Sequence, residues 1–288
     1  MPQCPTRLPA GPELARELEH VLALGIVGGL RDQLPGERPE CAFAVVEDEG
    51  GAPAAAALRT APRNAVLSVG PPQAIVALAE HIADGLADLP GVIGPAASVA
   101  WFADRWREST GDALRPAMAL RAYACAEPTP VPGVAGRARP AVEGDRDVLA
   151  AFVEAFAAEA LDESLDGQEW AQGQLARGDE GGPFVWEDAG EVVAMASVVR
   201  PTPSTLTINN VYTPPAKRKR GYAGALTAAC TQWIRVEHGR SHACLFTDLA
   251  NPASNRAYTR VGFAPLGDYL DATVRGGGVR GASPTQQS

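Results

Sequence analysis

The sequence predicts two α/β domains in tandem, each with a central mixed β-sheet flanked by helices, and three observations lead to this prediction. The chain has 288 residues, about twice the size of a common single domain. Residues 127–136 contain three prolines and two glycines, a composition typical of a semi-rigid linker. The parts on either side of this linker share one order of strand-like and helix-like segments.

This shared order spans residues 42–72 and residues 183–215. Each copy contains a strand-like run, a glycine turn, a second strand, an Arg-x-x-Pro turn, a third strand and a Pro-Pro pair that leads into a helix-like run. The spacing from Asp48 to Pro71 is 23 residues, and from Asp188 to Pro214 it is 26. We interpret the two copies as two folds of one kind. The alternative is a pair of unrelated hairpins with common turn residues.

We therefore expect an N-terminal domain over residues 1–126, a linker over residues 127–136 and a second domain over residues 137–274. Residues 275–288 are rich in Gly, Ser and Gln and are expected to form a flexible tail.

Composition and charge exclude several classes of protein. A hydrophobic fraction of 46% and a charged fraction of 20% indicate a packed chain rather than a disordered one. The net charge of -9 argues against binding nucleic acid or an anionic membrane with the whole surface. No apolar run approaches the ~20 residues that span a bilayer. The start also lacks a signal-peptide pattern, so we expect a soluble, cytoplasmic protein.

The cysteines and histidines do not suggest a metal site. The five cysteines are scattered without a C-x-x-C pair, and none of the four histidines lies at zinc-ligand spacing from them. We expect reduced thiols, mostly buried, and no bound metal.

The second half of the chain carries a local positive patch. From residue 192 to residue 236 there is no Asp or Glu, and the only two lysines of the protein lie in this window. The first half has no basic run at the corresponding place, after Pro72. Any anion site is therefore expected in the second half. The cations of the window are Arg200, Lys217, Arg218, Lys219, Arg220 and Arg235.

The basic run precedes a predicted helix. Apolar residues recur at three- and four-residue spacing from Tyr222 to Ile234, and Gly239 is a natural terminator. The run therefore lies at a helix N-terminus, where free backbone N–H groups and the positive end of the helix dipole favour anions. Gly221 has no Cβ to block a phosphate, and Ala223 and Gly224 are small for the same reason.

The pattern Arg218-x-x-Gly221-x-Ala223 matches neither the Walker nor the Rossmann glycine motif. It resembles the pyrophosphate-binding [RQ]-x-x-G-x-[GA] signature of the GNAT acetyltransferase superfamily. This resemblance implies acetyl-CoA as the acyl donor. The alternative is a solvated basic turn or a nuclear-localisation-like run. The cofactor-binding residues implied here are Val211, Tyr212, Thr213, Arg218, Lys219, Arg220, Gly221, Tyr222, Ala223 and Gly224.

A second element downstream also resembles this superfamily, with the pattern N-x-x-[AS]-x-x-x-Y-x-x-x-G-F. Its fixed positions are met by Asn251, Ser254, Tyr258, Gly262 and Phe263. The resemblance implies that Tyr258 protonates the departing CoA thiolate. It also implies that Asn251, Ser254 and Asn255 help to bind the cofactor. Otherwise Tyr258 only packs under the next strand, and Asn251 only caps a helix.

The resemblance covers residues 137–273, and the first half, without a phosphate loop, looks like a degenerate copy. The implied reaction is direct transfer of an acetyl group from acetyl-CoA to an amine in a ternary complex. A backbone N–H near Val211 would polarise the thioester carbonyl. The acceptor, a small-molecule or peptide amine, cannot be identified from the sequence.

The general base is missing from the expected place. Many family members carry a Glu on the strand before the phosphate loop, but here Asn209 and Asn210 stand in that region. A non-catalytic acyl-CoA sensor or scaffold therefore stays open as an alternative, and so does nucleic-acid binding through residues 217–220. Carboxylates that could replace the base are Glu154, Glu159, Asp162, Glu163 and Asp166.

Overall fold

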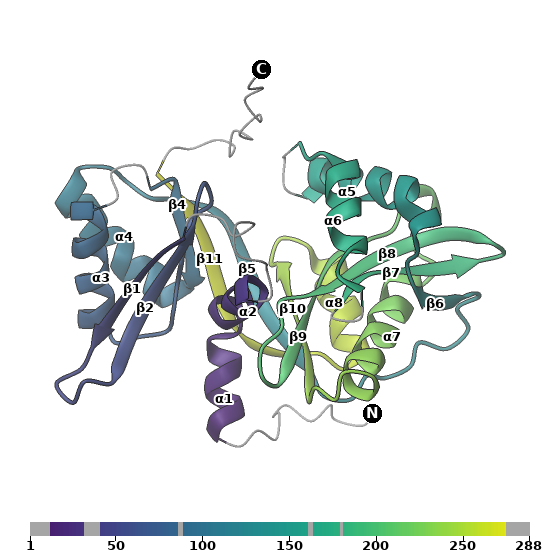
Figure 1. The fold of residues 1–288 in the computed structure, drawn as a ribbon, viewed down its shortest axis with the longest axis horizontal. Helices are drawn as coiled ribbons and strands as arrows, with labels where there is room; N and C mark the ends of the chain where they lie inside the picture. The colour runs from purple at the N-terminus through teal and green to yellow at the C-terminus, as the bar shows by residue number, and fades with distance from the viewer. Residues whose placement is uncertain (1–11, 32–40, 86–88, 161–163, 179–180, 275–288) are drawn as a thin grey trace.

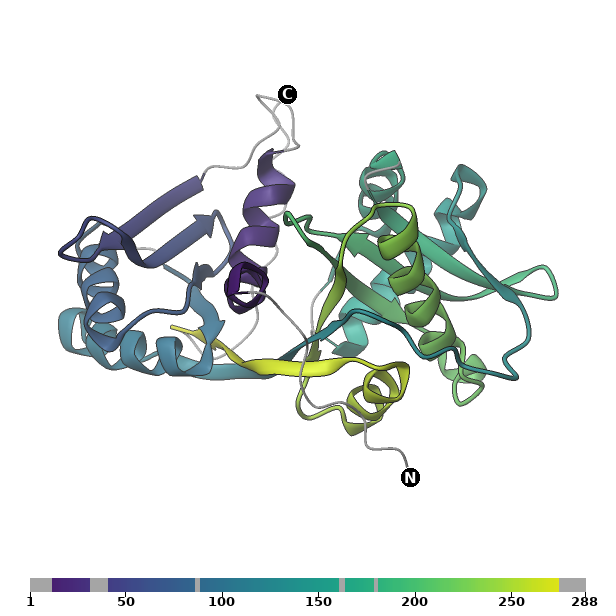
Figure 2. The same cartoon turned by 90° about the horizontal axis from the view of Figure 1, so that it is seen from below.

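The structure of the chain is a computed structural model that describes residues 12–31, 41–85, 89–160, 164–178 and 181–274. Its strands form a single 11-stranded mixed sheet in the order β1-β2-β3-β4-β11-β5-β10-β9-β8-β7-β6. Helices cover the sheet in both halves, which lie side by side, with α1 and α2 between them (Figures 1 and 2).

The first half alternates short strands with helices. Its elements are α1 (Pro12–Glu19), α2 (Val21–Arg31), β1 (Cys41–Glu47), β2 (Pro53–Thr60), β3 (Ala65–Leu67), α3 (Pro72–Gly85), β4 (Gly91–Pro95), α4 (Ala96–Thr110) and β5 (Arg115–Cys125). A core of apolar residues from β2 to β4 packs against α3 and α4, which gives these helices their buried faces.

The second half follows after the linker. Its elements are β6 (Arg137–Pro140), a 3₁₀ turn (Glu143–Asp145), α5 (Arg146–Ala160), α6 (Gly167–Leu175), β7 (Gly182–Asp188), β8 (Glu191–Val199), β9 (Thr205–Tyr212), a 3₁₀ turn (Pro215–Lys217), α7 (Tyr222–Val236), β10 (His242–Asp248), α8 (Pro252–Val261) and β11 (Ala264–Thr273). The largest core lies under α7 and α8.

The two halves have the same connectivity. In the first, β1, β2 and β3 pair antiparallel, and β3 then pairs parallel with β4 across α3. In the second, β7, β8 and β9 pair antiparallel, and β9 pairs parallel with β10 across α7. Helices α4 and α8 then lead to the last strand of each half. The predicted tandem α/β fold is confirmed.

The last strands of the two halves are exchanged, which the sequence analysis did not anticipate. Strand β11 lies between β4 and β5, and β5 lies between β11 and β10. Figure 2 shows β11 running along β5 into the first half. An ion pair between Arg121 and Asp268, at 2.6 Å, supports this contact. Each half therefore contributes a strand to the sheet of the other, and the boundaries 1–126 and 137–274 stay predictions.

The linker is packed along the second half. The Thr129 N–H donates to the Val261 carbonyl at 2.7 Å, at the end of α8. The Trp186 Nε1–H donates to the Ala135 carbonyl at 2.8 Å. Val131 and Val134 pack against the core under α7. The proline-rich segment is thus held in place by hydrogen bonds and apolar contacts as well as by its composition.

The remaining expectations concern the cysteines, membrane-crossing helices and groups of metal-binding side chains. Of the described cysteines, Cys125, Cys230 and Cys244 are buried and Cys41 is exposed. Cys4 and the expected tail lie outside the described residues. The described helices include none with the length and apolarity that a membrane crossing requires. No group of three or more His, Cys, Asp or Glu side chains gathers in the described part of the chain.

Candidate active site

The parallel strands β9 and β10 pair over a short stretch only. Their register covers Thr205 to Thr207 opposite His242 to Cys244, and the remainder of each strand is not paired with the other. Beyond this point β9 stays paired with β8 through a bulge that adds Asn210 and Val211. A gap in the hydrogen-bonded sheet between β9 and β10 therefore begins after Thr207, and Val211 lies in the part of β9 beyond that point.

Polar atoms without partners line the unpaired end of β9. Asn209 Oδ1 and Thr213 Oγ1 are buried, and neither has a hydrogen-bond partner in the described chain. Buried polar atoms without a partner are costly. Asn210 has a positive φ of 48° and follows directly on Asn209. Partnerless polar atoms on both sides of the bulge fit a polar ligand better than they fit an apolar core.

The turn before α7 presents backbone donors. Gly221 is the N-cap, with a left-handed φ of 86°, a conformation that favours glycine. The first bond into the helix runs from the Ala225 N–H to the Gly221 carbonyl, at 3.0 Å. The N–H groups of Tyr222, Ala223 and Gly224 therefore point out of the helix start without an acceptor among the described residues. Such a set of donors fits a pyrophosphate.

Two of the four consecutive cations are already engaged. Lys217 pairs with Glu191. Arg218 pairs with Glu159 at 2.5 Å and donates from Nε to the Thr213 carbonyl at 2.8 Å. Lys219 and Arg220 are exposed and have no ion-pair partner in the parts of the chain that the structure describes. Arg218 thus braces the turn, while Lys219 and Arg220 stay available to a bound anion.

The second predicted element forms the start of α8. The Asn251 side chain accepts from the Ser254 N–H at 3.1 Å, so Asn251 is a helix cap. The Asn255 amide donates to the carbonyls of Asp248 and Asn251, at 2.9 and 2.7 Å. Both asparagine side chains therefore hold the helix start. Each would contact the cofactor only through the hydrogen-bonding capacity that these bonds leave unused.

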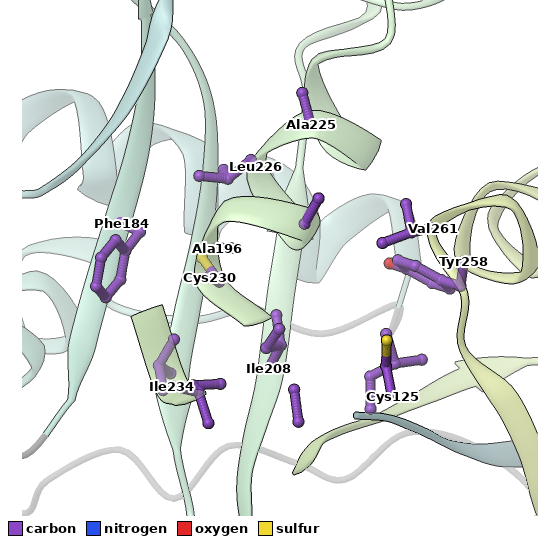
Figure 3. Packing of buried hydrophobic residues seen from close by; sticks show 14 of the residues in the cluster. Cys125, Phe184, Ala196, Ile208, Ala225, Leu226, Cys230, Ile234, Tyr258 and Val261 are labelled. Atoms are coloured by element: carbon purple, nitrogen blue, oxygen red, sulfur yellow. The ribbon is translucent and has the colours of Figure 1, made fainter. Parts of the chain in front are cut away.

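Tyr258 is 9% exposed and lies in the core between α7 and α8 (Figure 3). Its ring packs edge-on against Phe263, with 6.1 Å between centroids. Its hydroxyl points toward α7 in Figure 3, and no hydrogen bond to the described part of the chain contributes to its pKa, which burial alone shifts. Burial raises the pKa of Tyr258 to about 12. The hydroxyl therefore keeps its proton at neutral pH and is a hydrogen-bond donor without an acceptor.

The structure assigns no general base among the expected carboxylates. Glu154 accepts from the Gly167 N–H at 3.1 Å, and Asp166 caps α6. Hydrogen bonds, first from Arg218 and then from Tyr212, lower the pKa of Glu159, which makes it a weaker base. Asp162 and Glu163 lie outside the described residues.

Three contacts near the site were not anticipated. Tyr123 donates its hydroxyl proton to Asn255 Oδ1 at 2.9 Å, and Tyr222 donates to Asp188 at 2.5 Å. Val134, in the linker, lies where a Cβ on Gly221 would come within 2.8 Å of its Cγ2. Tyr123 is 132 positions from its partner, and no local pattern could have revealed the contact.

Together, the exchanged tandem sheet, the gap between β9 and β10 and the N–H donors at the start of α7 define a tandem α/β protein in which one helix start presents backbone donors. Residues 147–263 match the family described as "Acetyltransferase (GNAT) family". No curated protein matches the chain significantly.

Solved structures share the fold over nearly the whole chain. A GCN5-related N-acetyltransferase from Kribbella flavida has 17% identity and a TM-score of 0.61, covering 90% of this chain and 96% of its own. One from Sphaerobacter thermophilus has 19% identity and a TM-score of 0.55, covering 93% and 95%. A tandem GNAT protein from the clavulanic acid biosynthesis pathway has 15% identity and a TM-score of 0.53, covering 94% and 98%. At these identities the likeness is one of fold. Family and fold together support an acetyltransferase.

Proposed function

We propose that the second half of the chain is an acyl-CoA-dependent N-acyltransferase that moves an acetyl group from acetyl-CoA to an amine by direct attack in a ternary complex. The observation that carries this proposal is the row of N–H groups at Tyr222, Ala223 and Gly224, which have no acceptor in the described chain. They adjoin the unpaired ends of β9 and β10. A helix start of this kind binds phosphate groups through backbone donors.

In this proposal the pyrophosphate of acetyl-CoA lies on the α7 start, and Lys219 and Arg220 balance its charge. Arg218 contributes indirectly, because it stabilises the turn through its contacts with Thr213 and Glu159. The segment from Val211 to Thr213 contacts the amide-bearing arm along the edge of β9. Asn251, Ser254 and Asn255 border the same site from the start of α8.

The chemistry is assigned to two donors. The backbone N–H of Val211, at the bulge, polarises the thioester carbonyl and stabilises the oxyanion that forms. The Tyr258 hydroxyl donates to the departing sulfur. A free thiol titrates near ~8.5, whereas the pKa of Tyr258 is raised to about 12. Full proton transfer from Tyr258 therefore runs uphill, and its hydrogen bond to the thiolate is the stabilising interaction that we propose.

The acceptor is a small-molecule or peptide amine, used by a cytoplasmic protein without nucleic acid, membrane or metal as a partner. No base is assigned. An amine that reaches the site uncharged gives up one proton after its attack, and this proton balances the departing thiolate, to which it passes directly or through a water relay.

A non-catalytic acyl-CoA sensor is the second candidate. It is favoured by one observation: Glu154, Glu159 and Asp166 are all engaged in hydrogen bonds or ion pairs. The Tyr258 hydroxyl, a donor without a partner, favours the enzyme.

Two measurements test the proposal. Calorimetry should show acetyl-CoA binding to the native protein, with no comparable binding to random-sequence DNA. CoA thiol release over a panel of small amines and peptide N-termini should then exceed the rate without protein. Absence of acetyl-CoA binding would overturn the proposal, and binding without thiol release for any amine would favour the sensor.

A further inference from the structure

A tyrosine of the first half is tied to the helix that carries Tyr258. Tyr123 lies on β5, the exchanged strand, opposite Leu245 of β10 and Pro265 of β11. It is 4% exposed and belongs to the same core as Tyr258 and Phe263. Its hydroxyl donates to Asn255 Oδ1 at 2.9 Å. The contact therefore reaches from the first half of the chain into the start of α8.

The direction of this hydrogen bond follows from the other partners of Asn255. The carbonyls of Asp248 and Asn251 can only accept, so the Asn255 amide nitrogen must face them, at 2.9 and 2.7 Å. The amide oxygen is then left to face Tyr123, whose hydroxyl must donate. One side chain thus joins the end of β10, the cap of α8 and strand β5.

The turn before α8 is also bonded to β5, since the Leu249 N–H donates to the Ala119 carbonyl at 2.8 Å, whereas the bond from Tyr123 reaches a residue of α8 itself. Its end is held separately, because the Thr129 N–H bonds to the Val261 carbonyl at 2.7 Å. Asn255 and Tyr258 are three residues apart and so lie on neighbouring positions of one helix face. A shift of the helix start at Asn255 would therefore move the Tyr258 hydroxyl relative to β9.

We propose that Tyr123 is a positioning residue for the acyl-transfer site: through Asn255 it holds the start of α8 so that the Tyr258 hydroxyl faces the departing sulfur. This inference rests on the proposed function. Under this inference the first half, which lacks donors of its own for a phosphate, contributes to the site of the second half. Tyr123 does not touch substrate and acts only through Asn255.

The test uses the full chain and matched hydroxyl deletions. Tyr123→Phe removes the donor. Tyr269→Phe is the control, because Tyr269 is also buried, lies on β11 and donates its hydroxyl proton to the Glu19 carbonyl at 3.0 Å. Each variant loses one hydrogen bond of similar length, but only the bond lost in Tyr123→Phe connects to α8. Asn255→Ala removes the same tie from the helix surface, should Tyr123→Phe fail to fold.

The readouts are kcat and KM for acetyl-CoA, from thiol release with the best amine of the panel. We expect Tyr123→Phe to lower kcat by about tenfold to 100-fold, since small misplacements of a reacting group cost this much. KM should change less than about threefold, and Tyr269→Phe should keep native kcat. In a Tyr258→Phe background, Tyr123→Phe should lower kcat no further, because its effect passes through the Tyr258 hydroxyl.

Other outcomes overturn the inference. If Tyr123→Phe matches Tyr269→Phe in kcat, or if its loss adds in full to that of Tyr258→Phe, Tyr123 has only a structural role. In both cases native thiol release persists, and the proposed function stands. A native protein that binds no acetyl-CoA, or releases no thiol, overturns both proposals together.

Discussion

The starts of α3 and α7 occupy the same place in the two halves but differ in what they offer an anion. At α3, Pro72 has no N–H, and the N–H groups of Ala74 and Ile75 both donate to the Pro71 carbonyl, at 3.0 and 3.2 Å. At α7, Gly221 turns the chain through a left-handed φ and leaves the next N–H groups without described acceptors. Among the described residues, α3 leaves only the Gln73 N–H without an acceptor in its first turn, whereas α7 leaves the N–H groups of Tyr222, Ala223 and Gly224.

The helices that follow differ in the same sense. Counted from the first helical residue, Tyr258 is the seventh residue of α8, and Phe102 is the seventh of α4. Phe102 is fully buried and stacks on Trp106 with 5.9 Å between centroids. The first half therefore has the apolar ring without the hydroxyl. The comparison teaches that a shared sheet topology leaves chemistry to a few backbone donors and one hydroxyl.

The largest effect is expected from making the second half resemble the first at this position. Tyr258→Phe should lower kcat by about 100-fold or more, because general acid and hydrogen-bond donors contribute this much. The acetyl-CoA dissociation constant should stay within about threefold of native, since the ring and its packing remain. Thiol-release kinetics and calorimetry measure the two quantities. An unchanged kcat would leave Tyr258 as a packing residue, like Phe102.

Ion pairs differ between the halves in burial, which predicts a difference in acid sensitivity. Asp145 is 6% exposed and accepts from Arg139 at 2.6 Å, and this contact, followed by the Val142 N–H, lowers the Asp145 pKa. In the first half, Arg105 meets Glu80 and Glu108 at the surface. Asp145→Asn should cost about 2 kcal/mol at pH 7, and Arg105→Ala at most about 1 kcal/mol.

The pH dependence follows from the sign of the shift. A lowered carboxyl pKa contributes stability that is complete above the unfolded value, here 3.8, and is lost as the pH falls through the folded value. Urea unfolding at pH 7, 4 and 3 should therefore show the gap between native protein and Asp145→Asn closing below about pH 4. A gap of constant size would show that the carboxylate charge of Asp145 contributes nothing.

Gly221→Ala should weaken acetyl-CoA binding by about tenfold, because it strains the turn and removes space beside the phosphate donors. It should also cost about 1–2 kcal/mol of stability, since a left-handed φ disfavours Ala, and its Cβ would meet Val134. Gly111→Ala is the matched control, with a left-handed φ of 79° and no atom within 4 Å of the added Cβ. It should lose stability alone. Equal acetyl-CoA affinities in the two variants would show that Gly221 does not contribute to acetyl-CoA binding.

The smallest effects are expected from single cations. Lys219→Ala and Arg220→Ala should each weaken acetyl-CoA binding by about threefold at low salt, and by less at ~1 M salt, where exposed charges are screened. Lys217→Ala should change affinity less, because Lys217 already pairs with Glu191. Calorimetry at two salt concentrations measures this. An effect at Lys217 as large as at Lys219 would argue that the whole run acts as a diffuse charge.

Local patterns predicted much of the fold. The apolar spacing after Gly221 predicted α7, and Asn251-Pro252 predicted the start of α8. These are short-range preferences, because the contacts that determine where a helix starts are made between residues close together in the chain. The role expected of Val211 came instead from the family resemblance, and the structure places Val211 on β9 beyond its pairing with β10.

The rest depended on contacts between distant parts of the chain. The pairing of Arg218 with Glu159 joins residues 59 positions apart, and it turned an expected phosphate ligand into a brace. The engagement of Glu154 and Asp166 likewise removed two expected bases. Side-chain pairing of this kind has no periodicity along the sequence, so residue patterns do not reveal it.

The sequence by itself determined where helix α7 begins, which half carries the basic run before it and which tyrosine lies one helix further on. These follow from glycine, charge and apolar spacing over a few residues. Only the tertiary structure decided that β5 and β11 change places and that Tyr123 meets Asn255. The physical reason is that strand order in a sheet is set by packing between segments more than a hundred residues apart, and local preferences are the same for either order.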